Sequence, residues 1–172
     1  MASKMDLIVA GPDRHVLAAA IRHNQGSGPP AIADLVGTGL RLRDGSSGDI
    51  LLSIPPEQLA LAEADLRDDV LLTARQFVMA ENLPEEGIAP AASPLQLNGS
   101  QITASVPAAI TVTTNANVWA YIEGGPQPIV HRLTIDKSLT TASEPLHLPA
   151  GQYRVLVLAT GVRAALVNET VP

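Results

Sequence analysis

Short apolar runs rich in β-branched residues recur through the C-terminal half of the chain, and Gly, Pro, Asn or Asp separate them. Runs of this composition and spacing are typical of strands joined by turns. They predict about seven strands, at 101–106, 109–115, 118–124, 129–136, 146–148, 152–160 and 162–171. The regular spacing favours a small antiparallel β-sandwich or barrel in this half of the chain.

The run 152–160 shows the alternation that a strand produces, because successive side chains point to opposite faces. Tyr153 and Val155 fall on one face, and Leu156 and Leu158 fall on the other. Since both faces are largely apolar, this strand is predicted to be central in its sheet.

The string LPAGQYRVLVLATG, residues 148–161, resembles the penultimate-strand signature of bacterial and phage immunoglobulin-like domains. In that signature a proline–glycine corner leads into a tyrosine and alternating valines. The resemblance implies that Tyr153 is a structural corner residue, with its ring in the core and its hydroxyl bonded to nearby backbone. There is no cysteine pair, and Trp119 lies on the predicted third strand. The resemblance concerns the fold, which hosts unrelated functions.

The N-terminal half has a mixed pattern. Residues 40–54 predict a β-hairpin with a Gly/Ser/Asp tip. Residues 55–66 predict a helix, because prolines open the segment and Leu59, Ala62 and Leu66 form an apolar stripe.

Two other segments of this half each fit two structures. Residues 70–80 fit a continuation of the helix or a strand. Residues 6–23 fit a hairpin turned at 11–13, or a helix capped by Asp13. We therefore expect residues 1–82 to form a small β-rich mixed domain with one or two short helices.

The two halves meet at residues 83–94, which hold three prolines, a glycine and two adjacent glutamates. This composition predicts a semi-rigid linker. The expected chain is mainly β: an anchor or assembly domain at 1–82, the linker, and an immunoglobulin-like β-sandwich at 95–172.

The composition excludes several kinds of site. Aromatic residues make up 2 % of the 172 residues, so stacking surfaces for sugars or bases are scarce. The absence of cysteine excludes disulfides, thiolate nucleophiles and Cys-type zinc sites. The first residues lack the apolar stretch of a secretion signal, and no apolar run approaches the roughly 18–20 residues that span a bilayer. We expect synthesis in the cytoplasm without a signal peptide, and no membrane insertion.

The net charge of −6 is unevenly distributed. Residues 1–87 carry seven basic and thirteen acidic side chains, whereas residues 88–172 carry four of each. Lysine and arginine do not cluster anywhere in the sequence, so the chain lacks the electrostatic signature of nucleic-acid binding.

The densest acidic patch is the segment EADLRDD, with Glu63, Asp65, Asp68 and Asp69. If the segment is helical, Asp65 lies one turn before Asp68 and Asp69, so these like charges meet on one face, where they could hold Ca²⁺ or receive a basic partner surface. The alternative is a solvated helix end with Arg67 as an internal counter-charge. We take the four carboxylates as a candidate partner-docking patch.

No motif predicts catalysis or a cofactor. The four histidines, His15, His23, His131 and His147, lack metal-ligand spacing. A nucleophile elbow and a phosphate loop are also missing from the sequence. We therefore assign no catalytic, cofactor-binding or metal-binding residue, and expect a protein that is not an enzyme.

The rings of Trp119 and Tyr121 are two residues apart and share one face of a predicted strand. Two rings on one face can form a small sugar-stacking platform. The alternative is a pair of packed core rings.

These observations favour a structural or interaction protein. Immunoglobulin-like domains in bacteria usually belong to exported proteins, whereas phage proteins carry them without an export signal. We expect a phage or prophage virion component, such as a capsid decoration, neck or tail-associated accessory protein. Its partners would be other virion proteins, or itself as a homo-oligomer. The alternative is a module that binds a glycan or a host cell surface.

Overall fold

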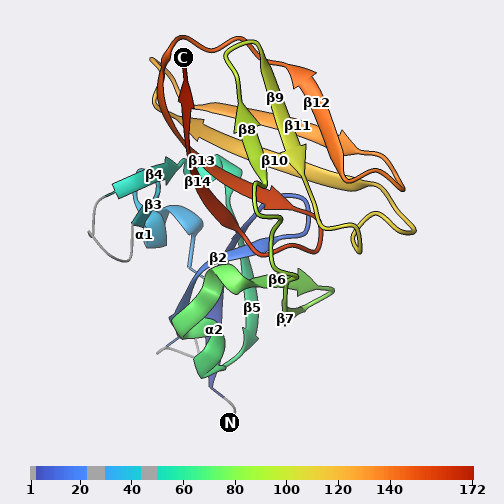
Figure 1. Cartoon of the computed structure of the whole chain (residues 1–172). Coiled ribbons are helices and arrows are strands. Elements are labelled where there is room, and N and C mark those ends of the chain that lie inside the picture. Colours follow the sequence, from blue (N-terminus) through green and yellow to red (C-terminus); the bar gives the residue numbers. More distant parts are fainter. Residues whose placement is uncertain (1–2, 23–29, 44–49) are drawn as a thin grey trace. The chain divides into compact units, whose positions relative to one another are not determined.

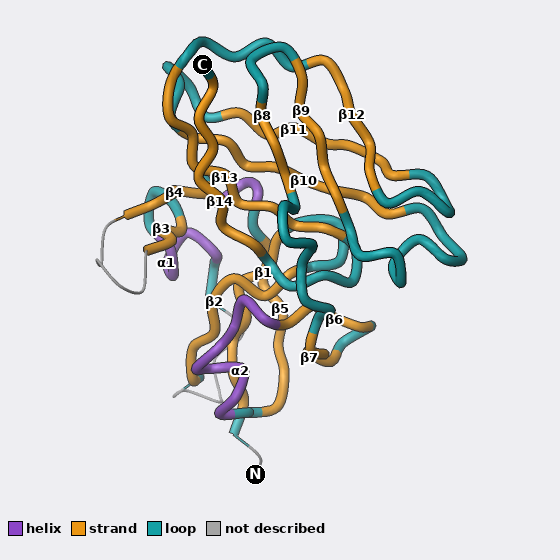
Figure 2. Tube along the Cα trace, viewed as in Figure 1, coloured by secondary structure: helices purple, strands orange, loops and turns teal. Residues whose placement is uncertain are grey.

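The computed structural model describes residues 3–22, 30–43 and 50–172. In these residues the chain is mainly β, with short helices and several separate sheets (Figures 1 and 2). The expected mainly β class is therefore confirmed. The chain divides into two compact units, Met1–Gly87 and Ile88–Pro172.

A three-stranded antiparallel sheet organises the N-terminal unit. Its strands are β1 (Lys4–Ala10), β2 (His15–Ile21) and β5 (Ala60–Asp65). They lie in the order β2-β1-β5, and β1 and β2 form a hairpin. Of the two structures open for residues 6–23, the chain adopts the hairpin. Its turn contains Gly11 with φ 82°, a left-handed conformation that glycine adopts without strain.

Alternate residues of β1 form the core of this unit. Met5, Leu7 and Val9 are fully buried on one face of the sheet, and Ala62 and Ala64 of β5 extend that face. The same core receives side chains from the segment after β5, which forms α2 (Asp68–Thr73), the 3-10 turn η2 (Ala74–Gln76) and β6 (Phe77–Ala80). Residues 70–80 thus contain both a helix end and a strand.

The helix predicted at 55–66 is wrong. Pro56–Gln58 makes a single 3-10 turn, η1, and the chain then extends as β5. In β5 the burial has a period of two, because Ala62 and Ala64 are buried whereas Glu63 and Asp65 are exposed. Pairing with β1 supplies backbone hydrogen bonds and burial that outweigh the helix propensity of a segment rich in Ala, Leu and Glu.

Two further hairpins and a second helix, α1 (Ile32–Val36), complete this unit. β3 (Leu40–Arg43) pairs with β4 (Ile50–Ile54), as the prediction for 40–54 requires, and the predicted tip lies outside the described residues.

The predicted linker at 83–94 needs correction at its start. Its first residues form β7 (Leu83–Glu86), which pairs with β6 in the N-terminal unit. Pro84 is tolerated there because, among the residues that the structure describes, β7 pairs with β6 alone and its other edge needs no N–H donor from Pro84. Further along, Ile88 forms a parallel bridge with Val162 inside the C-terminal unit. Residues 83–86 of the predicted linker therefore belong to the N-terminal unit.

Seven strands in two antiparallel sheets form the C-terminal unit, whose residues are all described. They are β8 (Leu95–Leu97), β9 (Gln101–Ser105), β10 (Ala116–Glu123), β11 (Ile129–Ile135), β12 (Thr141–Pro145), β13 (Gly151–Ala159) and β14 (Ala165–Val171). One sheet has the order β11-β10-β13-β14 and the other has the order β12-β9-β8. Both sheets contribute to one apolar core, which includes Ile102, Val118 and Val155.

Two of the strands predicted in this unit are wrong. Residues 109–115 form turns, held by the buried Thr111 hydroxyl, which donates to the Leu139 carbonyl at 2.5 Å. Residues 146–148 are not a strand either, because the pairing with β9 ends at the preceding Pro145. Proline cannot donate to a sheet and is common where an edge strand ends.

Candidate functional site

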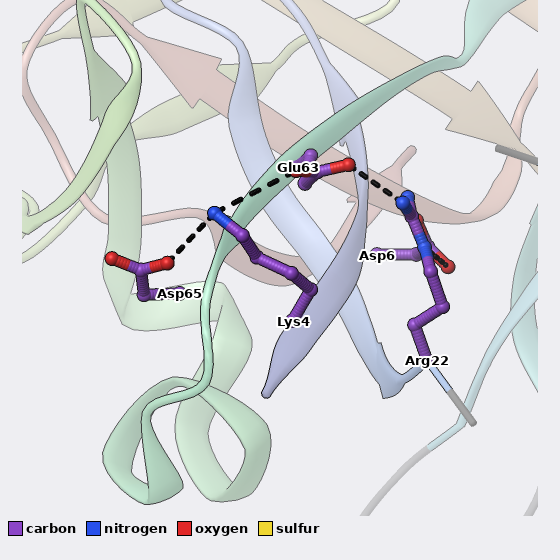
Figure 3. Close-up of polar contacts among 5 residues, drawn as sticks. All are labelled: Lys4, Asp6, Arg22, Glu63 and Asp65. Atoms are coloured by element: carbon purple, nitrogen blue, oxygen red, sulfur yellow. Dashed lines mark hydrogen bonds and ion pairs between the residues drawn. The ribbon is translucent and has the colours of Figure 1, made fainter. Parts of the chain in front are cut away.

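Five charged side chains form a network on the face of the N-terminal sheet opposite Met5, Leu7 and Val9 (Figure 3). We call this network, made of Lys4, Asp6, Arg22, Glu63 and Asp65, the charged ladder. The strand register places Lys4 opposite Asp65 and Asp6 opposite Glu63. Lys4 and Asp6 of β1, and Glu63 and Asp65 of β5, alternate with the core residues of their strands, so the pleat directs them to one face.

Asp6 and Arg22 form the buried centre of the charged ladder. The Arg22 Nε lies 3.1 Å from both carboxylate oxygens of Asp6, and Nη2 of the same guanidinium also donates to that carboxylate. The two side chains are only 8 % and 12 % exposed. The third nitrogen, Nη1, donates to Glu63 at 2.6 Å, so one guanidinium connects β1 to β5. Paired and hydrogen-bonded in this way, the charges are tolerated away from water.

Lys4 connects the outer carboxylates. Its Nζ lies 2.8 Å from Asp65 and 3.7 Å from Glu63. The hydrogen bond with Asp65 raises the pKa of Lys4, and the hydrogen bonds with Asp6 raise the pKa of Arg22. Both cations therefore stay charged at neutral pH. Because Lys4 and its partners are well exposed, these outer pairs contribute little to stability.

The structure splits the predicted acidic patch into two groups. Glu63 and Asp65 belong to the charged ladder, whereas Asp68 and Asp69 lie in the first turn of α2. Asp65 does not share a helical face with Asp68 and Asp69, because it lies on the strand β5. Acidic residues suit a first helical turn, where unpaired backbone N–H groups favour negative charge.

Arg67 neutralises part of the second group. Its guanidinium binds the Asp69 carboxylate with Nη2 at 2.6 Å, and this hydrogen bond lowers the pKa of Asp69. The same guanidinium donates to the Pro84 carbonyl at 2.7 Å and lies 5.3 Å from the centroid of the Phe77 ring. The predicted counter-charge role of Arg67 thus applies to Asp69.

Trp119 and Tyr121 lie on the face of β10 opposite the core residues of that strand. The Arg132 guanidinium lies over the Trp119 ring, 4.1 Å from its centroid. Tyr121 is 3 % exposed, and this burial raises the pKa of its hydroxyl. With one ring stacked on a cation and the other buried, the arrangement favours packed rings over a sugar-stacking platform.

Tyr153, at the start of β13, is 3 % exposed and belongs to the C-terminal core. Its hydroxyl donates to the Pro149 carbonyl at 2.8 Å. The hydrogen bond therefore ties the chain before β13 to the strand itself.

The sequence reasoning missed two polar pairs. The first is Asp6 with Arg22, and its signal was a single carboxylate inside the apolar run MDLIVA. The second is His131 Nε2 with Glu144 Oε2, 3.1 Å apart, which connects β11 of one sheet to β12 of the other. Its signal was weaker, because only the period of two placed His131 on the inner face with Leu133.

Other candidate chemistry is not gathered into a site. His15 is buried and His147 is exposed, while His23 lies outside the described residues. Among residues 3–22, 30–43 and 50–172, no cluster of His, Cys, Asp or Glu has a geometry that could hold a metal ion. Over the same residues, no helix combines the length and apolar character needed to cross a membrane.

The chain matches no protein-family model, and no curated protein matches its sequence.

Proposed function

We propose that this chain is a non-enzymatic structural protein of a phage or prophage virion, such as a capsid decoration, neck or tail-associated accessory protein. In this proposal the C-terminal unit is a displayed immunoglobulin-like domain, and the acidic N-terminal unit is the side that docks onto the particle. The observation that carries the proposal is the strand order of the C-terminal unit.

The strand order supports an immunoglobulin-like sandwich. The first two strands of the unit, β8 and β9, share one sheet, and the next two, β10 and β11, lie in the other. β12 returns to the first sheet beside β9, and β13 and β14 complete the second. Crossing between two sheets in this order is the connectivity expected of such domains.

Tyr153 gives independent support. It lies on the penultimate strand, its ring is buried, and its hydroxyl is bonded to backbone four residues upstream. These are the features of the corner tyrosine that accompanies immunoglobulin-like folds. Trp119 departs from that pattern, since it is on the third strand but faces away from the core.

The difference in charge between the units supports the docking side. The four basic and four acidic side chains of residues 88–172 balance one another, whereas residues 1–87 carry the whole net negative charge. Asp65 and Glu63 keep 68 % and 46 % of their side chains exposed although both are paired. Exposed carboxylates of this kind attract a basic surface, with a strength that salt reduces.

The test is co-sedimentation of the full chain with particles purified from the phage or induced prophage that encodes it, across a salt series. We expect saturable binding that weakens as salt rises, and weaker binding for Asp68→Asn/Asp69→Asn. Asp136→Asn, in the C-terminal unit, is the matched control and should bind as the wild type does. Absence of binding to every particle fraction would contradict the proposal. Saturable affinity for a free sugar that is lost in Trp119→Ala would replace it with the glycan-binding alternative.

A further inference from the structure

β5 is an edge strand, and the backbone N–H and C=O groups that do not pair with β1 can be assigned to particular residues. Within the described residues it pairs with β1 and with no other strand. Directly after β5, the Leu66 N–H donates to the Ser3 carbonyl at 2.9 Å. That bond fixes the phase of the β1–β5 pairing, because antiparallel pairs alternate between hydrogen-bonded and non-hydrogen-bonded ones.

By this alternation, Asp65 and Glu63 form non-hydrogen-bonded pairs with Lys4 and Asp6 of β1. Their backbone N–H and C=O groups therefore point away from β1, toward the free edge. The carboxylates of the same two residues stand on the ladder face beside that edge. Main-chain hydrogen-bonding groups and negative charge thus occur together at two successive edge-facing positions, Glu63 and Asp65.

The charges of the ladder are ordered across the sheet. The cations Lys4 and Arg22 lie on the β1 and β2 side, and the charged side chains that the edge strand presents on this face, Glu63 and Asp65, are both carboxylates. Each edge carboxylate binds a cation on its β1 side and keeps acceptor capacity for another donor. A second β5 edge would place like charges opposite each other, which is destabilising. A strand with basic side chains would continue the alternation of sign.

We propose that the β5 edge takes up an extended segment of another virion protein that carries Lys or Arg at alternate positions, as an added strand. Main-chain hydrogen bonds to Glu63 and Asp65 would supply affinity, and the alternating cations would set the register. Side chains directly opposite across such a pair have Cβ atoms about 4.5–5.5 Å apart, within reach of an ion pair. This inference rests on the proposed docking role of the N-terminal unit and specifies its contact.

The experiment uses the full chain and a fluorescent heptapeptide, Thr-Lys-Val-Lys-Val-Lys-Thr, measured by fluorescence anisotropy. One control peptide has the same composition with its lysines contiguous. The other has N-methyl groups on the residues whose N–H would face β5, which blocks the added strand but keeps the charge. We expect saturable binding of the first peptide. Both control peptides should bind about tenfold more weakly, because main-chain hydrogen bonds or register are lost. The alternating peptide should bind Asp65→Asn more weakly than it binds Asp68→Asn.

Equal binding of the three peptides would overturn strand addition, since attraction between opposite charges alone would explain it. Lack of binding to all three would overturn it as well. Self-association of the free chain that Asp65→Asn strengthens would assign the edge to a second copy and contradict the basic partner. Co-sedimentation with particles that the alternating peptide does not inhibit would leave the proposed function standing and remove this inference alone.

Discussion

The two units differ in what covers the faces of their sheets. In the C-terminal unit two sheets bury their inner faces against each other, and one apolar core serves both. In the N-terminal unit one face of the three-stranded sheet is apolar, and the other carries the charged ladder. The first arrangement follows from hydrophobic burial, which is not directional. The second depends on matched partners, because a buried charge is tolerated only when it is paired.

This difference predicts which substitutions reduce the stability of each unit most. A core of aliphatic side chains loses stability in proportion to the atoms removed. A buried ion pair adds little by itself, but removal of one partner leaves the other charge uncompensated. Substitutions of similar size should therefore change the unfolding free energy of the two units by different amounts.

The largest effect is expected for Ile102→Ala in the C-terminal unit. Ile102 is fully buried in the shared core, and removal of its side chain leaves a cavity that costs about 4 kcal/mol of unfolding free energy. Urea unfolding of both proteins measures the loss. Val112→Ala is the control, because Val112 is 64 % exposed and should change stability by about 0.5 kcal/mol or less. A similar loss for both variants would mean that the core assignment is wrong.

The next effect is expected for Asp6→Ala, which leaves the Arg22 guanidinium mostly buried with Glu63 as its remaining carboxylate. We expect a loss of unfolding free energy that is smaller than that of Ile102→Ala and confined to the N-terminal unit. Urea unfolding followed by NMR signals from each unit measures this. Asp6→Leu/Arg22→Leu removes both charges and should recover much of the loss. If the double variant is less stable than Asp6→Ala, the charged ladder is a net stabilising network, and the statement that its buried ion pair adds little stability is wrong.

A smaller effect is expected for Tyr153→Phe, which removes the hydrogen bond to the Pro149 carbonyl but keeps the ring. The expected loss is about 1 kcal/mol, read from urea midpoints. Tyr121→Phe is the matched control, because the Tyr121 hydroxyl is buried and has no hydrogen-bond partner within the described chain. Equal midpoints for Tyr153→Phe and the wild type would show that its hydroxyl does not hold the corner.

The smallest effect concerns the exposed pair of Arg67 and Asp69. The Arg67 hydrogen bond holds the pKa of Asp69 below its ordinary value of 3.8, so the pair contributes stability above that pH and loses it as the pH falls through the lowered pKa. Arg67→Gln should bring the Asp69 pKa back toward the ordinary value, as measured by NMR titration of its carboxyl carbon. Arg75→Gln is the control. An unchanged pKa in Arg67→Gln would contradict the observed pairing.

The C-terminal strands were predicted correctly where the sequence has both an alternation of period two and a composition rich in β-branched residues. Residues 152–160 alternate and are β-branched, and β13 lies there. β12 was missed because TASEP has neither feature, and its strand state comes from pairing with β9. Residues 109–115 have β-branched composition, but the hydrogen bond of Thr111 to a distant carbonyl holds them in turns. Contacts of this kind have no local signal in the sequence.

The charged ladder was less predictable, because it also depends on contacts between residues that are distant in the sequence. It requires β5 to be a strand, whereas Ala, Leu and Glu favoured a helix. It also requires the register that places Glu63 opposite Asp6, and a turn that returns Arg22 to β1. The sequence places Glu63 and Asp65 in an acidic segment, but their cation partners come from the tertiary fold.

The most direct test of the account is an NMR study of residues 88–172 expressed alone, because the proposed role depends on an autonomous domain with this strand order. The fragment begins at Ile88 so that the bridge to Val162 is kept. We expect dispersed amide signals, and cross-strand contacts between Ala104 and Ala142 in one sheet and between Tyr121 and Leu156 in the other. A collapsed spectrum, or a strand order other than β11-β10-β13-β14 and β12-β9-β8, would contradict the account.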